Sequence, residues 1–190
     1  SEGLYYEDFS WLKNCTQCYK IFDASQYISS ILCGHFMNPF DMGFDMIITT
    51  LHKNYPGPQK GLIAVKNADV VWEQYLAHAK TYISNTHPKA IADSLLPLMY
   101  KEQFNKYCET CNSCVSELEK LLFDYKVPIV RRSDEQTPTH HLWILCSDKY
   151  KSYQYYLKLE SIGLLTNYRL LPYNLGYGLR IGLNARSEEH

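Results

Sequence analysis

One segment constrains the fold more than any other: a β-branched apolar run that ends in His-Lys and is followed by Pro-Gly-Pro. The run "DMIITT", residues 45–50, has the length and side chains of a buried strand. His52 and Lys53 follow it, and the turn "NYPGPQKG" then leads into a second strand-like run, "GLIAVKN". A Lys in this position is either a solvated strand end or a reactive, desolvated amine.

A similar run precedes this segment. The stretch "YKIFDASQ" predicts a short strand that ends in Asp23, and "ISSILCGHFMNPFDMGF" predicts a helix and loops between the two strands. This alternation is typical of an α/β layer with a mostly parallel sheet. Ligands of such sheets bind at the carboxyl ends of the strands, where Asp23 and Lys53 both lie.

The pattern changes after about residue 87. Apolar residues then recur every three or four positions up to Tyr125, which predicts an amphipathic helix broken near Pro97. The runs "VPIVRR", "HHLWILCS" and "GLRIGLN" predict strands, and "DKYKSYQYYLKLESIG" predicts a helix that stops at Gly163. We therefore expect an α/β layer with a mostly parallel sheet over residues 1–87 and a smaller α+β domain over residues 88–190.

Composition narrows the class of protein. The chain is 46% hydrophobic and 21% charged, so it can bury a core. Its net charge of −1 provides no basic field for nucleic acid or an anionic membrane. No run is long and apolar enough to span a membrane, and no secretion signal opens the chain. With seven Cys, an odd count, we expect free thiols in a reducing, cytoplasmic compartment.

Asp23 and Lys53 together indicate a specific chemistry. Pyridoxal phosphate acts as an electron sink while its ring nitrogen stays protonated, and enzymes secure that proton with a carboxylate. The cofactor's aldehyde carbon bonds to a lysine amine. Two strand ends, thirty residues apart, would supply one group each. For an isolated Lys, a solvated surface position is the more common interpretation.

Five motifs, in order, resemble serine hydroxymethyltransferase, a fold-type-I pyridoxal-phosphate enzyme of the aspartate aminotransferase superfamily. They are "FDASQ", then "IITTLHK" with "GPQKG", then "THHLWIL", "NYRLLP" and "GLRIGLNA". The resemblance covers nearly the whole chain and corresponds to the C-terminal half of the family's enzymes. It implies part of the large cofactor-binding domain followed by the small C-terminal domain.

The resemblance implies a role for each motif. Lys53 would be the Schiff-base lysine, and Asp23 would pair with the pyridine nitrogen. His52 would support the lysine or the cofactor phosphate, and Thr50 would place a hydroxyl near the imine. Arg180 would hold the substrate's α-carboxylate, because a guanidinium matches a carboxylate at two points.

The resemblance implies less specific roles for three further residues. By this resemblance Gln26 takes the position of a family His and would lie near the cofactor's 3′-oxygen, where it can donate a hydrogen bond but cannot titrate. Gly57 belongs to the turn that follows the lysine, and we expect it to contribute to the cofactor-binding site. His141 matches a strand His that contacts substrate, although a packing His at this position is an equally good interpretation.

Other departures from the family pattern weaken the expectation that the protein uses folate more than the expectation that it uses the cofactor. "SNTHPK" replaces a glycine-rich loop that lends backbone amides to a neighbouring subunit's phosphate, and Ser84, Asn85 and Thr86 would have to substitute with side-chain donors. Arg169 replaces the second Asn of an Asn-x-Asn-x-x-Pro segment. Tetrahydrofolate is therefore a doubtful cosubstrate. The implied reaction makes or breaks the Cα–Cβ bond of a β-hydroxy amino acid such as serine or threonine.

The family's phosphate-binding loop and acid–base Glu have no counterpart in this sequence. We therefore expect a missing upstream half or a partner chain, and self-association as a dimer or tetramer. Two alternatives stay open. The chain is a transaldolase or aminotransferase of the same fold, or it is a non-catalytic subunit paired with an intact homologue.

The cysteine spacing raises a separate possibility. Cys15 and Cys18, together with the triplet at Cys108, Cys111 and Cys114, have the spacing of zinc ligands. The triplet lies in a helical pattern, and no Gly or Pro provides the tight turn of a zinc knuckle. We therefore predict no metal site.

Overall fold

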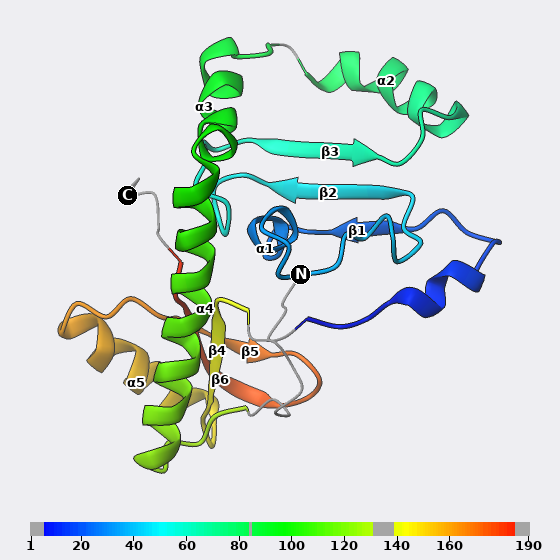
Figure 1. The fold of residues 1–190 in the computed structure, drawn as a ribbon. Coiled ribbons are helices and arrows are strands. Elements are labelled where there is room, and N and C mark those ends of the chain that lie inside the picture. Colours follow the sequence, from blue (N-terminus) through cyan, green and yellow to red (C-terminus); the bar gives the residue numbers. More distant parts are fainter. Residues whose placement is uncertain (1–5, 84, 131–138, 185–190) are drawn as a thin grey trace. The chain divides into compact units, whose positions relative to one another are not determined.

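The computed structural model describes residues 6–83, 85–130 and 139–184. The chain forms two compact units, Asp8–Lys106 and Tyr107–Asn184, and the boundary falls inside one long helix, α4 (Lys101–Asp124; Figure 1).

Unit 1 contains a three-stranded sheet of β1 (Ile21–Asp23), β2 (Met46–Thr50) and β3 (Gly61–Val65) in the order β1-β2-β3. β1 pairs with β2 in parallel, and β3 pairs with β2 in antiparallel orientation (Figure 1). All three strands lie where the sequence predicts them. The mixed α/β architecture is confirmed, but the prediction of a mostly parallel sheet holds for only one of these two pairings.

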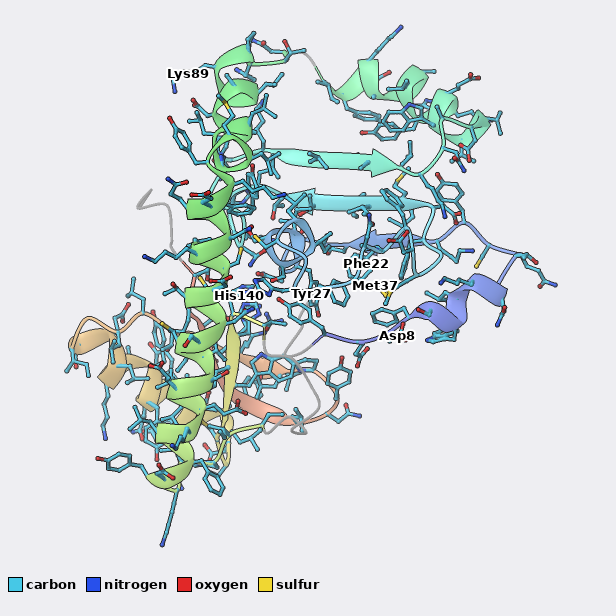
Figure 2. The ribbon with its side chains drawn as sticks, in the orientation of Figure 1. Asp8, Phe22, Tyr27, Met37, Lys89 and His140 are labelled. Atoms are coloured by element: carbon cyan, nitrogen blue, oxygen red, sulfur yellow. The ribbon has the colours of Figure 1, made fainter. Side chains whose placement is uncertain are left out.

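An aromatic cluster forms the core of unit 1. Phe22 of β1 packs edge-on against Phe44, with ring centroids 5.0 Å apart, and also contacts Tyr27 and Phe36. Phe9 reaches both Phe22 and Phe44. Phe22 and Tyr27 are labelled in Figure 2. Because Phe22 directly precedes Asp23, this packing fixes the end of β1.

The helices of unit 1 are the 3₁₀ helix η1 (Ser10–Asn14), α1 (Ile28–Leu32), α2 (Val70–Tyr82) and α3 (Pro88–Met99). The sequence pattern did not predict α2. Asp69 caps the first turn of this helix, because its side chain accepts a hydrogen bond from the Trp72 amide. The predicted break near Pro97 occurs at Tyr100, between α3 and α4. Neither α2 nor α3 buries a residue.

Unit 2 contains an antiparallel sheet of β4 (His141–Leu145), β5 (Asn167–Leu171) and β6 (Gly176–Gly182) in the order β4-β6-β5. Helix α5 (Lys149–Ser161) packs against β5 and β6, and the buried Ser152 hydroxyl donates to the Gly178 carbonyl at 3.0 Å. Gly163 ends this helix as predicted, with φ at +82°.

Two elements of unit 2 differ from the prediction. The run "VPIVRR" forms a single bridge, Ile129 to Ile144, and its last two residues lie outside the described part of the chain. The sequence pattern also did not predict β5, because "NYRLL" lacks apolar alternation. Trp143 and Leu171 form the buried centre of this unit, with Val130 and Leu145 packed against them. No helix of the described chain has the length and hydropathy to cross a bilayer.

Candidate functional site

Asp23 and the segment that contains Lys53 lie at the same edge of the first sheet, the edge formed by the carboxyl ends of β1 and β2. Asp23 is the last residue of β1 and is paired with Ile48 of β2, and the Ala24 amide donates to the Ile48 carbonyl at 2.8 Å. Because the two strands are parallel, Thr50 and then Lys53 leave β2 at the end where Asp23 leaves β1. The prediction that both residues follow the carboxyl ends of neighbouring strands is confirmed.

A buried polar contact joins the two segments beyond the sheet. The Ser29 amide donates to Asn54 Oδ1 at 2.8 Å, and the Ser29 hydroxyl donates to the Asn54 carbonyl at 2.8 Å. Both residues are nearly inaccessible, with 1% and 4% of their surface exposed. Since Asn54 follows Lys53, α1 holds the lysine segment at two points, the side chain and the backbone carbonyl of Asn54.

The Asp23 carboxyl is held as a carboxylate. Burial raises its pKa, but hydrogen bonds, including those from Ser25, outweigh that effect and leave the pKa below its ordinary value. The Ser25 amide donates to Asp23 Oδ1 at 2.9 Å. Asp23 remains exposed, while Ser25 and Gln26 behind it are buried. A fixed, negatively charged carboxylate at this edge is the group that would keep a pyridine nitrogen protonated.

Two polar atoms beside Lys53 are buried without a partner. Thr50 Oγ1 and His52 Nδ1 have no hydrogen-bond partner among the described residues. A buried polar atom left unsatisfied costs about 1–3 kcal/mol, and a ligand that forms hydrogen bonds with these two atoms would remove that cost. Lys53 lies between them and Asn54 in the sequence and is exposed.

Gly57 allows the turn after Lys53 to close. A Cβ atom at Gly57 would lie 2.8 Å from the Leu51 carbonyl oxygen and 2.8 Å from the Tyr55 ring. The Gly57 amide donates to that same carbonyl at 2.9 Å. Only a residue without a side chain fits between them, and the loop from Leu51 to Gly57 therefore folds back tightly around His52 and Lys53.

Unit 2 carries a second polar cluster at the β4–β6 pair. Arg180 of β6 is paired with Trp143 of β4, and His141 is paired with Gly182. The His141 amide donates to Thr139 Oγ1 at 3.1 Å, and the rings of His140 and His141 lie 4.0 Å apart. The structure thus brings Arg180 and His141, two predicted substrate-binding residues, onto neighbouring strands.

The pKa of His140, a member of this cluster, is strongly lowered. Burial is the main cause and the positive charge of Arg180 the second, and together they lower the pKa of His140 to about 4. His140 is therefore neutral at physiological pH. Its backbone carbonyl accepts from the Leu183 amide at 2.8 Å, which anchors the chain just after β6 (His140 is labelled in Figure 2).

Sequence reasoning missed four residues of these clusters: Ser29, Asn54, Thr139 and His140. Ser29 and Ser30 lie between two Ile residues in α1, and polar residues at core positions are a signal that could have identified Ser29. Thr139 and His140 precede β4, and the family motif points to His141 instead of either. Asn54 gave no signal besides its place next to Lys53.

The groups at the end of β1 and after β2 can be matched to an organic cofactor. No group of three or more His, Cys, Asp or Glu side chains gathers within residues 6–83, 85–130 and 139–184. A carboxylate and a lysine at the same sheet edge fit pyridoxal phosphate, which bonds to a lysine amine and pairs its ring nitrogen with an acidic group. Thr50, His52 and Gly57 lie within five residues of Lys53.

Comparison with known proteins finds similar sequences among serine hydroxymethyltransferases and threonine transaldolases. No protein-family model matches the chain. The chain is 29% identical over 170 residues to a serine hydroxymethyltransferase from Pyrobaculum arsenaticum, covering 87% of this chain and 40% of that protein. It is also 29% identical over 166 residues to an L-threonine:uridine-5′-aldehyde transaldolase from Streptomyces, covering 85% of this chain and 39% of that protein.

A solved structure supports the fold. An L-threonine transaldolase from Pseudomonas fluorescens, in its internal aldimine state, superimposes with a TM-score of 0.86 at 23% identity, covering 96% of this chain and 43% of that chain. This chain therefore has the fold of the corresponding part of that enzyme. It spans about 40% of the length of the curated relatives, and the region that it resembles is their C-terminal part.

Proposed function

We propose that this chain is the C-terminal part of a pyridoxal-phosphate enzyme that makes or breaks the Cα–Cβ bond of a β-hydroxy amino acid. The observation that carries the proposal is the parallel pairing of β1 and β2, which brings Asp23 and the Lys53 segment to one sheet edge. The similarity to serine hydroxymethyltransferase and threonine transaldolases supports it.

In this proposal Lys53 supplies the ε-amine that bonds the cofactor aldehyde, and Asp23 holds the proton on the ring nitrogen. The cofactor, when bound, withdraws electrons from the substrate Cα as one of its bonds breaks. Thr50 Oγ1 and His52 Nδ1 provide polar contacts at the same edge, and buried Gln26 and the close turn at Gly57 shape it.

Arg180 binds the substrate α-carboxylate in this proposal. A guanidinium with two parallel N–H groups fixes both the position and the plane of a carboxylate. Fixing the carboxylate orients the Cα–Cβ bond and so selects the bond that breaks. His140 beside Arg180 is neutral and adds no competing positive charge, while His141 offers a second contact to the substrate.

Transaldolase activity is a second candidate. Two of the similar proteins are named as L-threonine:uridine-5′-aldehyde transaldolases, at the same 29% identity as the hydroxymethyltransferase. Gln26 and Arg169, which depart from the hydroxymethyltransferase pattern, favour a reaction without tetrahydrofolate. In this reaction the glycine unit from threonine is passed directly to a second aldehyde.

We also propose that the active form is an assembly. About 60% of the relatives' length has no counterpart in these 190 residues, and the phosphate-binding and acid–base groups would come from that portion or from another chain. The exposed apolar residues of α3, among them Ile91, Leu95 and Leu98, support association through this helix.

The test is product analysis with the purified protein and any chain that co-purifies with it. With pyridoxal phosphate and L-threonine we expect acetaldehyde and glycine, and with a second aldehyde added, a new β-hydroxy amino acid. Lys53→Ala should abolish both products. A keto acid in place of the aldehyde would indicate an aminotransferase. Activity that persists undiminished in an assembly carrying Lys53→Ala would show that this chain is a non-catalytic subunit.

A further inference from the structure

The loop between η1 and β1 carries two neighbouring thiols. Cys15 Sγ and Cys18 Sγ are 3.2 Å apart and share a hydrogen bond. Cys18 is exposed and Cys15 is half-buried, so small molecules in solution can reach the pair. Both thiols are free, and neither takes part in the proposed cofactor site.

The loop holds this geometry in place. The Cys15 amide donates to the Leu12 carbonyl at 3.0 Å, which closes the end of η1. The Lys20 ammonium donates to the Cys15 carbonyl at 2.7 Å, and the Lys20 amide donates to Asp45 Oδ2 at 2.8 Å. The chain is therefore anchored on both sides of the two cysteines, and their sulfur atoms are kept as neighbours.

We propose that Cys15 and Cys18 form a redox-active dithiol, which low-molecular-weight disulfides such as glutathione disulfide oxidise to a reversible intramolecular disulfide. One thiolate attacks a sulfur of the oxidant, forms a mixed disulfide and releases one reduced thiol. The second thiolate then attacks the mixed disulfide and releases the other reduced thiol. The protein loses two protons and two electrons, and the oxidant becomes two thiols.

The second step is what distinguishes this pair from the other cysteines. A neighbouring thiol 3.2 Å away resolves the mixed disulfide by an intramolecular attack. Cys114 on α4 is exposed, whereas Cys111, three residues earlier on the same helix, is buried. Cys114 can therefore react with the oxidant, whereas Cys111 is shielded from it by burial.

The experiment treats the purified, fully reduced protein with glutathione disulfide, blocks the remaining thiols and maps cysteine peptides by mass spectrometry. We expect Cys15 and Cys18 in one peptide that has lost two hydrogen atoms and carries no glutathione, and a dithiol reductant should restore it. Cys114 should carry glutathione in the same sample, which shows that the oxidant was active. In Cys18→Ser, Cys15 should retain the glutathione that the wild-type protein releases.

Two results would overturn the proposal. In one, Cys15 and Cys18 each retain glutathione while the wild-type protein is otherwise folded, so that no intramolecular exchange occurs. In the other, both remain free thiols although Cys114 has reacted. Circular dichroism of the reduced wild-type and Cys18→Ser proteins provides the check on folding, and neither result depends on the enzyme's activity.

Discussion

Asp23, the last residue of β1, is paired in parallel register with Ile48, two residues before β2 ends at Thr50. This pairing is what places a carboxylate and the lysine segment at one edge, although they are thirty residues apart in the sequence. The proposed function depends on it, because a ring nitrogen and an aldehyde carbon on one small cofactor must be held from the two strands together.

Replacing Asp23 with Asn should weaken the cofactor's function with little effect on folding. Asn keeps the shape and can still accept from the Ser25 amide, but it carries no charge to hold the ring proton. A hydrogen bond to a charged group contributes about 1.5–3 kcal/mol, so turnover should fall by roughly 10- to 150-fold. Steady-state kinetics at saturating cofactor measure this loss.

Asp8 offers a matched control. Its Oδ1 accepts from the Ser10 amide two residues later, at 2.8 Å, in the same local arrangement. Asp8→Asn should leave turnover unchanged. Equal losses in the two variants would mean that Asp23 acts through local structure and not through the cofactor.

Gly57→Ala should disturb the lysine loop. The added methyl group would press on the Leu51 carbonyl and the Tyr55 ring, and overpacking of this kind costs about 1–3 kcal/mol. We expect a lower urea midpoint and weaker cofactor binding. A methyl group added at Gly61 would meet the Thr49 carbonyl at 3.7 Å, an ordinary contact, so Gly61→Ala should have little effect on either measurement.

Ser29→Ala should loosen the same loop from the other side. It removes the hydroxyl that donates to the buried Asn54 carbonyl, at a cost of about 1–3 kcal/mol. Ser116 on α4 also donates its hydroxyl to a carbonyl, that of Asn112, but it is exposed. Ser116→Ala should change the free energy of unfolding by no more than about 0.5 kcal/mol. If the two variants lose equal stability, the contact between Ser29 and Asn54 does not hold the lysine segment.

His140 should make stability depend on pH. Its pKa is about 4 in the folded protein against 6.5 in the unfolded chain. Between these values the unfolded chain binds a proton at His140 that the folded chain does not. The contribution of His140 to stability therefore falls as the pH decreases from 6.5 to 4, and this contribution changes no further below pH 4. The shift corresponds to roughly 3 kcal/mol over this window.

Urea unfolding across that pH range measures this dependence. His140→Gln should flatten the curve, whereas His78→Gln, at an exposed position on α2, should leave its slope unchanged. A wild-type slope retained in His140→Gln would assign the pH dependence to other groups.

The sequence predicted the strands at the candidate site because β-branched runs bounded by Gly, Pro and Asp are strong local signals. It did not predict α2, which has many apolar residues but buries none of them, or β5, which buries only its last residue, Leu171. In neither element does a periodic apolar face mark the segment. The direction of β3 was also not available, since strand direction depends on pairing and not on local pattern.

The site shows the same limits. Asp23, Thr50, His52 and Lys53 could be named from strand ends and a family resemblance. The contact between Ser29 and Asn54, and the burial of His140 beside Arg180, depend on which segments meet in space. Such contacts leave no spacing pattern in the sequence, which is why the residues that position the lysine loop were found only in the structure.

The most direct test of the central claim is to identify the lysine that bonds the cofactor. The purified protein, with any chain that co-purifies, is incubated with pyridoxal phosphate, reduced with borohydride, digested and mapped by mass spectrometry. We predict one dominant pyridoxyl label, on Lys53, and its loss in Lys53→Arg. A label distributed over exposed lysines such as Lys89, or one that persists in Lys53→Arg, would contradict the proposed role of Lys53.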